Sequence, residues 1–307
     1  MEELKSIKNI QNNYRAYLIP TDWCNFKCSY CIQEHKDKEK PSDEVLIERL
    51  SKAKKVLKLL SLGPSLTINF MGGEISCFDT LRLIKSLELE KIRPGVFILT
   101  SNFSGNNELY RKIDEYLNSI HIMHKFAFSF HGEFFSVEKF VDKIKDLNIS
   151  TFQKVTTVVN KNNMETANKL KNMLPKNIFF SFQYERSKDD EDIDSAEIQK
   201  NITNDDETNG RKIYYINNDK SKLYSRQEIL RLYGEKNGFL KTQGWKCNNL
   251  THTIRLKNDK LIFGPCFSEK EAGIDTDNKI TIKNSKICNK KHCSLCNIME
   301  IIKPNEI

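Results

Sequence analysis

The run TDWCNFKCSYC, residues 21–31, follows the apolar run AYLI at 16–19 after one proline, and the apolar run predicts a β-strand. Its cysteines, Cys24, Cys28 and Cys31, are separated by three residues and then by two. Three thiolates leave one iron of a four-iron cluster without a protein ligand, and an open iron can bind a small molecule and pass it an electron. The spacing therefore favours a reactive iron–sulfur cluster.

Two other interpretations stay open on spacing alone. A CxxC pair is also half of a zinc site, or a redox-active dithiol. A zinc site needs a fourth ligand, and His35 is the one candidate close by in the sequence. A dithiol has no need of Cys24 four residues upstream. The rest of the chain decides between these interpretations.

The bulk properties set limits on the class of protein. At 307 residues the chain is long enough for one large domain and one small domain. No apolar run approaches the ~18 residues of a membrane span, and the N-terminus has no apolar signal segment. Nine cysteines without an export signal argue for a reducing compartment and for metal ligation. We therefore expect a cytoplasmic protein with no membrane partner.

The net charge of +8 is modest for this length. A basic balance can indicate nucleic-acid binding, but the lysines are scattered and do not alternate with aromatic residues in a binding platform. Nucleic acid is therefore not favoured as a partner.

Short β-branched or aromatic runs alternate with amphipathic helical stretches in the first 185 residues. The expected strands are 16–19, 66–70, 96–100, 126–130, 154–159 and 178–182. The expected helices are 43–60, 79–91, 108–120, 137–147 and 165–174. This alternation predicts a parallel α/β sheet, in which ligands bind at the carboxyl ends of the strands.

The pattern stops near residue 187, where a polar, acidic segment begins. Within it we expect a short strand at 212–216 and a helix at 226–233. Five cysteines then fall within about fifty residues, which indicates a small domain organised by metal. We therefore expect a barrel domain over 1–186, a charged linker or insertion over 187–243 and a cysteine-rich domain over 244–307.

The residues Gly72, Gly73 and Glu74 follow directly after the second expected strand. Two glycines let the backbone approach a ligand closely, and a carboxylate beside them can receive an ammonium group. Alone, the motif is an ordinary glycine turn with a capping glutamate. Beside an open cluster it predicts a site for an amino-acid-like ligand.

With these two motifs the chain resembles the radical S-adenosylmethionine superfamily over about residues 14–185. The matching features are the three cysteines, the aromatic Tyr30 before the last of them, and Gly72-Gly73-Glu74. The resemblance implies a partial (β/α)6 barrel in which the amine and carboxylate of S-adenosylmethionine chelate the open iron, and in which Glu74 also holds the amine. Ile75 departs from the family, which often has proline there.

The resemblance also implies polar contacts to the cofactor from the ends of later strands. The candidates are Ser101, Asn102, Ser129 and Asn160. Each of them is equally well explained as a strand-terminal turn residue. His131, after the fourth strand, is a candidate base or substrate contact, or a hydrogen-bonded rim residue.

In the last part of the chain, 253–263 predicts a β-hairpin with a polar turn that brings Cys247 and Cys266 to one end. With Cys293 and Cys296 this layout resembles the Twitch version of the SPASM auxiliary-cluster domain. The resemblance implies that these four thiolates hold a second [4Fe-4S] cluster, and a zinc ribbon would use the same four. The fifth cysteine, Cys288, is then a spare thiol, a ligand in place of another, or a hydrogen donor to a substrate radical.

The expected function is that of a radical S-adenosylmethionine enzyme, with two [4Fe-4S] clusters and S-adenosylmethionine as cofactors and flavodoxin or ferredoxin as electron donor. A 5′-deoxyadenosyl radical would remove hydrogen from a substrate carbon, in crosslinking or epimerisation during maturation of a ribosomally made peptide. The short segment before the first strand leaves no room for a peptide-recognition domain, which weakens that case. The alternatives are oxidation or epimerisation of a sugar or aminocyclitol, and a zinc-organised nucleic-acid-binding protein.

Overall fold

The structure is a computed structural model, and its chain forms two compact units. The larger unit is Tyr14–Lys188 with Arg255–Leu261, and the smaller is Met1–Asn13, Asp189–Ile254 and Ile262–Ile307. The residues that the structure describes are 5–9, 14–31, 39–61, 65–160, 162–184, 214–224, 226–234, 240–241, 245–247, 253–258, 260–263, 286–287, 292–293 and 300–302.

A parallel sheet forms the centre of the larger unit. Its strands lie side by side in chain order, and each neighbouring pair is parallel. They are β2 (Tyr14–Ile19), β3 (Leu66–Phe70), β4 (Val96–Ser101), β5 (His124–Phe130), β6 (Gln153–Val159) and β7 (Phe179–Tyr184). The predicted parallel α/β sheet is therefore confirmed, with strand ends that differ by at most two residues from the expected ones.

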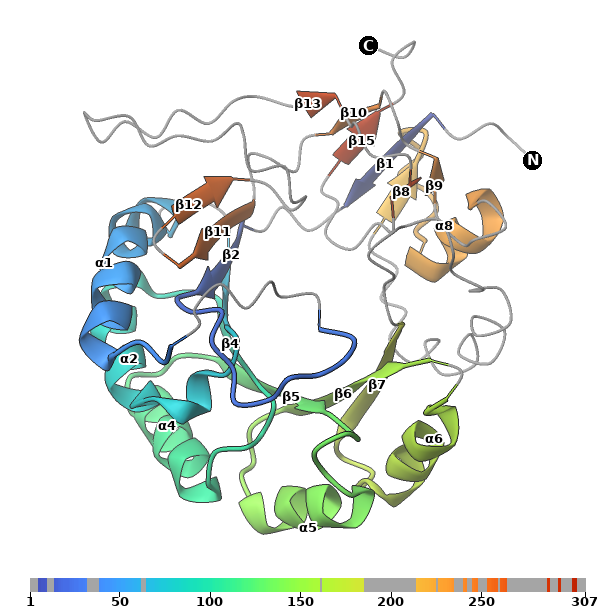
Figure 1. The fold of residues 1–307 in the computed structure, drawn as a ribbon. Coiled ribbons are helices and arrows are strands. Elements are labelled where there is room, and N and C mark those ends of the chain that lie inside the picture. Colours follow the sequence, from blue (N-terminus) through green and yellow to red (C-terminus); the bar gives the residue numbers. More distant parts are fainter. Residues whose placement is uncertain are drawn as a thin grey trace. The chain divides into compact units, whose positions relative to one another are not determined.

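Helices connect these strands and lie along the outer side of the arc that the strands form (Figure 1). They are α1 (Asp43–Leu60), α2 (Thr80–Ser86), α3 (Leu89–Ile92), α4 (Asn107–Ser119), α5 (Val137–Leu147) and α6 (Met164–Met173). A right-handed strand–helix–strand connection places each helix against the sheet that it joins. Since every strand then starts at the same edge, all the carboxyl ends lie together at the other edge.

Alternation along β5 shows how the sheet separates its two faces. Phe126, Phe128 and Phe130 are buried, whereas the residues between them, such as Ser129, are partly exposed. Burying each phenylalanine side chain contributes roughly 1.5–3 kcal/mol. Phe140 of α5 contacts Phe130, with ring centroids 5.1 Å apart. The phenylalanine face of β5 therefore packs on the helices, and the Ser129 face is the inner one.

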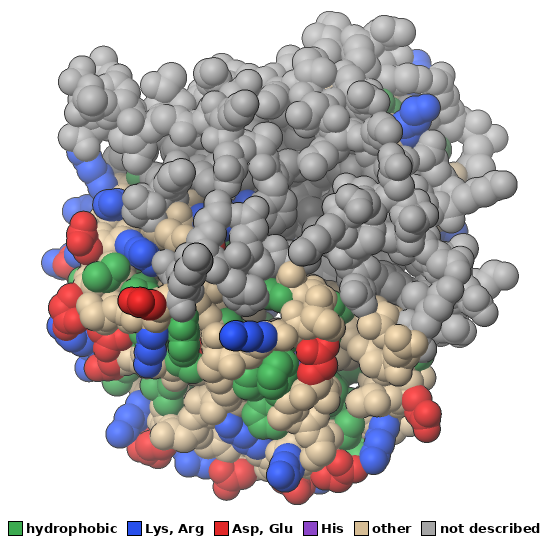
Figure 2. Space-filling view, viewed as in Figure 1, with side chains coloured by type: hydrophobic (Ala, Val, Ile, Leu, Met, Phe, Trp, Pro, Cys, Tyr) green, Lys and Arg blue, Asp and Glu red, His purple; other side chains and the backbone are tan. Residues whose placement is uncertain are grey.

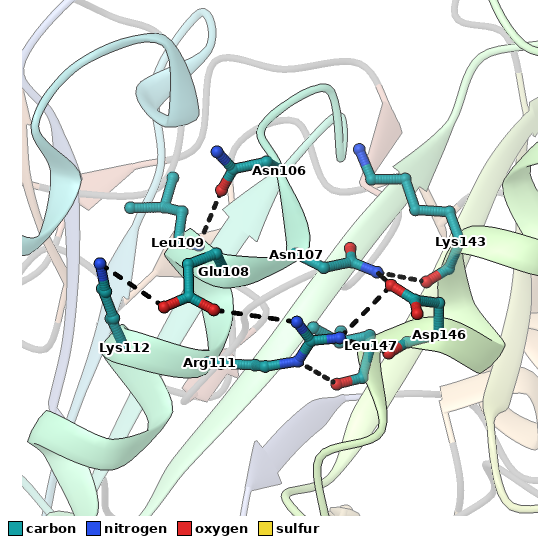
Figure 3. Close-up of polar contacts among 9 residues, drawn as sticks. All are labelled: Asn106, Asn107, Glu108, Leu109, Arg111, Lys112, Lys143, Asp146 and Leu147. Carbon is teal, nitrogen blue, oxygen red and sulfur yellow. Dashed lines mark hydrogen bonds and ion pairs between the residues drawn. The ribbon is translucent and has the colours of Figure 1, made fainter.

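The helices also bind one another through polar groups, as Figure 3 shows for α4 and α5. The Asn107 amide donates to the Lys143 carbonyl at 2.9 Å and to the Asp146 carboxylate at 2.7 Å. The Arg111 guanidinium donates to the carbonyl oxygens of Leu147 and Asp146 at the end of α5. The bonds from Arg111 satisfy backbone acceptors that the last turn of a helix leaves unpaired. The beginning of α4 is therefore fixed against the end of α5.

The single helix expected at 79–91 is instead two helices, α2 and α3. Glu88, between them, adopts a left-handed conformation with φ 54°. Leu87 and Leu89 are both fully buried, but in one continuous helix they would point about 200° apart. The break lets both leucines reach the core. Glu88 then pairs with Lys54 of α1 at 2.5 Å.

The hairpin predicted at 253–263 is confirmed. It consists of β11 (Thr253–Lys257) and β12 (Lys260–Phe263), which are neighbours in the sheet order and extend the sheet beyond β2. Asn258 takes the left-handed conformation in the turn, with φ 53°. Its amide donates to the Ile19 carbonyl at 2.8 Å. The turn of the hairpin therefore contacts the carboxyl end of β2.

The smaller unit joins the two ends of the chain. Its strands are β1 (Ser6–Asn9), β8 (Tyr214–Ile216), β9 (Leu240–Lys241), β10 (Lys246–Cys247), β13 (Lys286–Ile287), β14 (His292–Cys293) and β15 (Glu300–Ile302). Strand β1 pairs antiparallel with β15 and with β8. The expected strand at 212–216 corresponds to β8, and the expected helix at 226–233 is α8 (Arg226–Tyr233).

The face of the described residues in Figure 2 carries charges of both signs. Figure 2 shows Lys and Arg side chains interspersed with Asp and Glu over the face in view. Among the described helices, none combines the length and the apolar character that crossing a bilayer requires.

Candidate functional site

The three cysteines of the first motif lie on the segment that follows β2. The segment begins with the fully buried Thr21. The Thr21 hydroxyl accepts a hydrogen bond from the Trp23 amide at 2.9 Å, and the Cys24 sulfur accepts one from the Phe26 amide at 3.3 Å. The Cys31 amide donates to the Cys28 carbonyl at 3.1 Å. We call residues 21–31 the cysteine loop; these bonds fold it at the carboxyl edge of the sheet.

The glycines after β3 pack directly on the cysteine loop. The Gly73 amide donates to the Thr21 carbonyl at 2.8 Å, and the Glu74 amide donates to the Trp23 carbonyl at 2.9 Å. A Cβ atom on Gly73 would lie 1.9 Å from the Trp23 carbonyl oxygen, and one on Gly72 would lie 2.9 Å from the Thr21 carbonyl oxygen. Glycine is therefore required here because backbone meets backbone.

Glu74 is buried, with 1% of its surface exposed. Its carboxylate accepts hydrogen bonds from the Ser76 amide and the Ser101 hydroxyl, both at 2.8 Å, and from the Asn102 amide. Burial raises the pKa of Glu74, and these three donors oppose the rise. Within the described residues Glu74 forms no ion pair. The donors around Glu74 are amide and hydroxyl groups, and no ammonium or guanidinium group of the described residues donates a hydrogen bond to its carboxylate.

Asn102 connects the end of β4 to the cysteine loop. Its side-chain amide donates to the Asn25 side chain at 2.9 Å and lies 3.8 Å from the Cys24 sulfur. Its side-chain oxygen accepts from the Ser104 amide at 2.9 Å. Ser101, just before it, bonds both Glu74 and the Tyr110 hydroxyl. The structure therefore brings Ser101 and Asn102 to the predicted site, with protein groups as their partners.

His131, at the end of β5, lies against two residues of the cysteine loop. Its Nδ1 atom is 3.2 Å from the Cys28 sulfur and 2.9 Å from the Tyr30 hydroxyl oxygen. The rings of Tyr30 and His131 are nearly parallel, with centroids 5.9 Å apart. Burial lowers the pKa of His131 to about 4, which keeps the imidazole neutral at pH 7. Of the roles expected for His131, the structure supports a hydrogen-bonding one.

Two residues that follow His131 also contact the cysteine loop. The Ser29 hydroxyl and amide both donate to the Glu133 carboxylate, at 2.5 and 3.1 Å. Phe26 stacks on Phe134, with centroids 4.3 Å apart and planes 4° from parallel. The cysteine loop is thus held by residues that follow β3, β4 and β5.

Burial keeps the thiols of Cys24 and Cys28 protonated in this state. It raises the pKa of Cys24 to about 12 and that of Cys28 to about 11, and Cys31 adds to both shifts through repulsion between thiolates. No three His, Cys, Asp or Glu side chains of the described residues lie close enough to hold a metal ion. The structure therefore places the three cysteines on one loop without drawing their sulfurs into a ligand set.

Two other candidates lie at strand ends but apart from these contacts. Ser129 is half-buried on the inner face of β5 and makes no side-chain hydrogen bond to another described residue. The Asn160 side chain accepts from the amides of Asn162 and Asn163, at 2.9 and 3.2 Å. Asn160 therefore shapes the turn that opens α6, as the turn interpretation expected.

The second group of cysteines is described only in part. Cys247 lies on β10 and Cys293 on β14, which belong to different sheets. Cys266, Cys288 and Cys296 lie outside the described residues. The auxiliary-cluster ligands and the role of Cys288 stay predictions.

Sequence reasoning missed Asn25, Glu133 and Phe134. All three contact partners about eighty to a hundred positions away. Asn25 lies next to a cysteine, and Glu133 and Phe134 follow the strand-end residue His131. These positions are the signal that the sequence contained, and they do not identify the partners.

Comparison with known proteins agrees with this geometry. The family model described as "Radical SAM superfamily" matches residues 18–174, just over half of the chain. A search of curated proteins found no match.

Among solved structures, the chain is similar to Streptococcus suis SuiB bound to the precursor peptide SuiA. The TM-score is 0.52 at 15% identity, covering 89% of this chain and 64% of that one. SuiB bound to S-adenosylmethionine matches with a TM-score of 0.50 at 14% identity, covering 84% of this chain and 62% of that one. The chain thus spans less than two thirds of the length of these structures, and at such identities the likeness concerns the fold.

Proposed function

Since this chain belongs to the radical SAM superfamily, we propose that it uses the site at the carboxyl edge of its sheet to start radical chemistry on a peptide substrate. Membership of the superfamily supports an enzyme and implies a four-iron cluster and S-adenosylmethionine. This agrees with the enzymatic expectation and not with a zinc-organised nucleic-acid-binding protein. The residue roles and the substrate below belong to the proposal.

Cys24, Cys28 and Cys31 would hold the cluster, because thiolates are the ligands that iron–sulfur clusters require. When bound, the cluster and S-adenosylmethionine together supply a 5′-deoxyadenosyl radical that removes a hydrogen atom from a carbon of the substrate. Ligation takes the three thiols as thiolates, so the protons that burial retains on Cys24 and Cys28 would be released on loading.

One observation carries the proposal: the backbone contact between Gly73-Glu74 and Thr21–Trp23. It holds a buried carboxylate next to the first cysteine of the motif. A buried carboxylate is costly without an ion-pair partner, and Glu74 forms no ion pair with any described residue. The ammonium group of S-adenosylmethionine would supply such a partner, while Gly72, Gly73 and Tyr30 would line the same cofactor.

Ser101 and Asn102 would act mainly by holding the Glu74 carboxylate and the cysteine loop in register, since these are their partners here. Ser129, whose hydroxyl faces the inner side of the sheet, would contact the cofactor or substrate directly. Asn160 would contribute through the turn before α6.

A peptide substrate is supported by likeness of fold to a structure that binds a precursor peptide. The reaction would then be crosslinking or epimerisation during maturation of a ribosomally made peptide. A sugar or aminocyclitol is the alternative substrate. Flavodoxin or ferredoxin would supply the electron. A second cluster would be held by Cys247, Cys266, Cys293 and Cys296. In an epimerisation, Cys288 would be the hydrogen donor.

The experiment is a mass-spectrometric comparison of candidate precursor peptides, incubated anaerobically with reconstituted protein, dithionite and S-adenosylmethionine. Crosslinking predicts a loss of two hydrogens, and epimerisation in deuterated water predicts a gain of one deuterium. If 5′-deoxyadenosine is released but every peptide is unmodified while an aminocyclitol is consumed, the peptide assignment is wrong and the alternative holds.

A further inference from the structure

The contact of His131 with Cys28 has no place in the chemistry above. Cys28 Sγ and Tyr30 Oη both lie within hydrogen-bond distance of the same ring nitrogen, His131 Nδ1. His131 comes from the end of β5 and is 103 positions from Cys28. These three side chains therefore form a unit that only the fold brings together.

Ligation changes what this unit can do. A free thiol donates or accepts a hydrogen bond, but a cysteine sulfur bound to iron has no proton and can only accept one. The Nδ1–H group of His131, 3.2 Å from the sulfur, is then a donor to it. The Tyr30 oxygen accepts from the same N–H group, which leaves the Tyr30 hydroxyl proton to donate to the Cys28 sulfur as well.

A hydrogen bond to a cluster sulfur stabilises the state with more negative charge, which is the reduced state. We propose that His131, supported by Tyr30, donates a hydrogen bond to the Cys28 sulfur and thereby raises the reduction potential of the cluster. His131 is a positioning residue in this proposal, because it acts through a cluster ligand. The inference rests on the proposed function, since it requires a cluster on the cysteine loop.

The surroundings hold the unit in place. Phe26 packs edge-on against His131, with ring centroids 5.8 Å apart, and stacks on Phe134. Ser29 is bonded to Glu133. The packing and the hydrogen bond to sulfur come from different side chains, so the two effects can be separated by mutation.

The experiment measures the midpoint potential by anaerobic EPR-monitored titration of full-length reconstituted protein. The signal that changes on adding S-adenosylmethionine identifies the open cluster. His131→Leu removes the donor and should shift the potential to a more negative value. His131→Asn, whose side-chain NH2 group takes a position near that of Nδ1, should return the potential toward that of the unmodified protein.

Tyr30→Phe keeps the ring and removes the hydroxyl, and it should shift the potential in the same direction by a smaller amount. Phe134→Leu is the matched control, because it alters packing on the cysteine loop without touching the sulfur, and it should leave the potential unchanged.

An unchanged potential in His131→Leu with full iron content overturns the inference. If His131→Leu fails to hold iron, Tyr30→Phe decides, and an unchanged potential there also overturns it. Equal shifts in Phe134→Leu and His131→Leu assign the effect to packing and overturn it as well. In each of these cases the unmodified protein retains a cluster that responds to S-adenosylmethionine; if it has none, the proposed function itself fails.

Discussion

Gly73 lies where two backbone segments meet, and replacing it with alanine tests whether this contact builds the site. The new Cβ atom would lie 1.9 Å from the Trp23 carbonyl oxygen and 2.6 Å from the Asp22 carbonyl oxygen. Both neighbours are backbone atoms, so no side-chain rotation relieves the overlap. The loop and the strand end must separate, and the hydrogen bonds from the amides of Gly73 and Glu74 weaken or break with that movement.

The magnitude follows from these two effects. Overpacking of this kind costs about 1–3 kcal/mol, and each lost hydrogen bond costs about 1 kcal/mol. We therefore expect Gly73→Ala to lower the free energy of unfolding by about 3–5 kcal/mol. At an m value of about 3 kcal/mol/M, the urea midpoint should fall by about 1–1.7 M.

The assay is urea unfolding followed by tryptophan fluorescence in a Trp245→Phe background, which leaves Trp23 as the single tryptophan. Binding of S-adenosylmethionine is measured on the same reconstituted proteins. Gly132→Ala is the control, because a Cβ atom there meets no atom closer than 3.5 Å. It should stay within about 0.5 kcal/mol of the unmodified protein. If Gly73→Ala keeps both the midpoint and the affinity, the backbone contact does not build the site.

Two further predictions concern buried carboxylates. Because burial raises the pKa of Glu74 above its ordinary 4.5, the folded, cofactor-free protein binds that proton more tightly than the unfolded chain does. Its free energy of unfolding should therefore fall as the pH rises from about 4.5 through the raised pKa. Urea titrations at several pH values should show a smaller fall in Glu74→Gln than in the unmodified protein. An identical pH profile in the two proteins contradicts this prediction. Asp114, at the amino end of the sheet, accepts from His124 at 2.8 Å, from Asn118 at 3.2 Å and from Thr151. Asp114→Asn should lower the free energy of unfolding by about 1–3 kcal/mol and leave the affinity for S-adenosylmethionine unchanged. A loss of affinity at unchanged stability would refute the idea that the amino edge of the sheet stabilises the fold while the carboxyl edge binds the cofactor.

The sequence predicted the regular part of the fold because its signals are local. The apolar stripe of α1 and the alternation in β5 each follow from neighbouring residues. The break at Glu88 could not be predicted in the same way. It depends on Leu87 and Leu89 both reaching the core, and that core is made by residues far away in the chain.

The candidate site likewise has features that the local sequence predicts and features that depend on distant residues. Glycine at 72 and 73 indicates a close approach, and the structure shows that the approaching group is the backbone before Cys24. The three donors to Glu74 and the position of His131 beside Cys28 depend on strand order. A strand-end pattern predicts that such residues share one edge of the sheet, but it does not say which of them touch.

The most direct test of the account is the release of 5′-deoxyadenosine by anaerobically reconstituted protein given dithionite and S-adenosylmethionine. We expect release from the unmodified protein and from Cys77→Ala, a half-buried thiol outside the cysteine motif that serves as the control. Replacing Cys24, Cys28 and Cys31 together with alanine should abolish release and remove about half of the roughly eight irons that two four-iron clusters would supply. Release at an undiminished rate from the triple variant, or none from unmodified protein that holds its iron, would contradict the account.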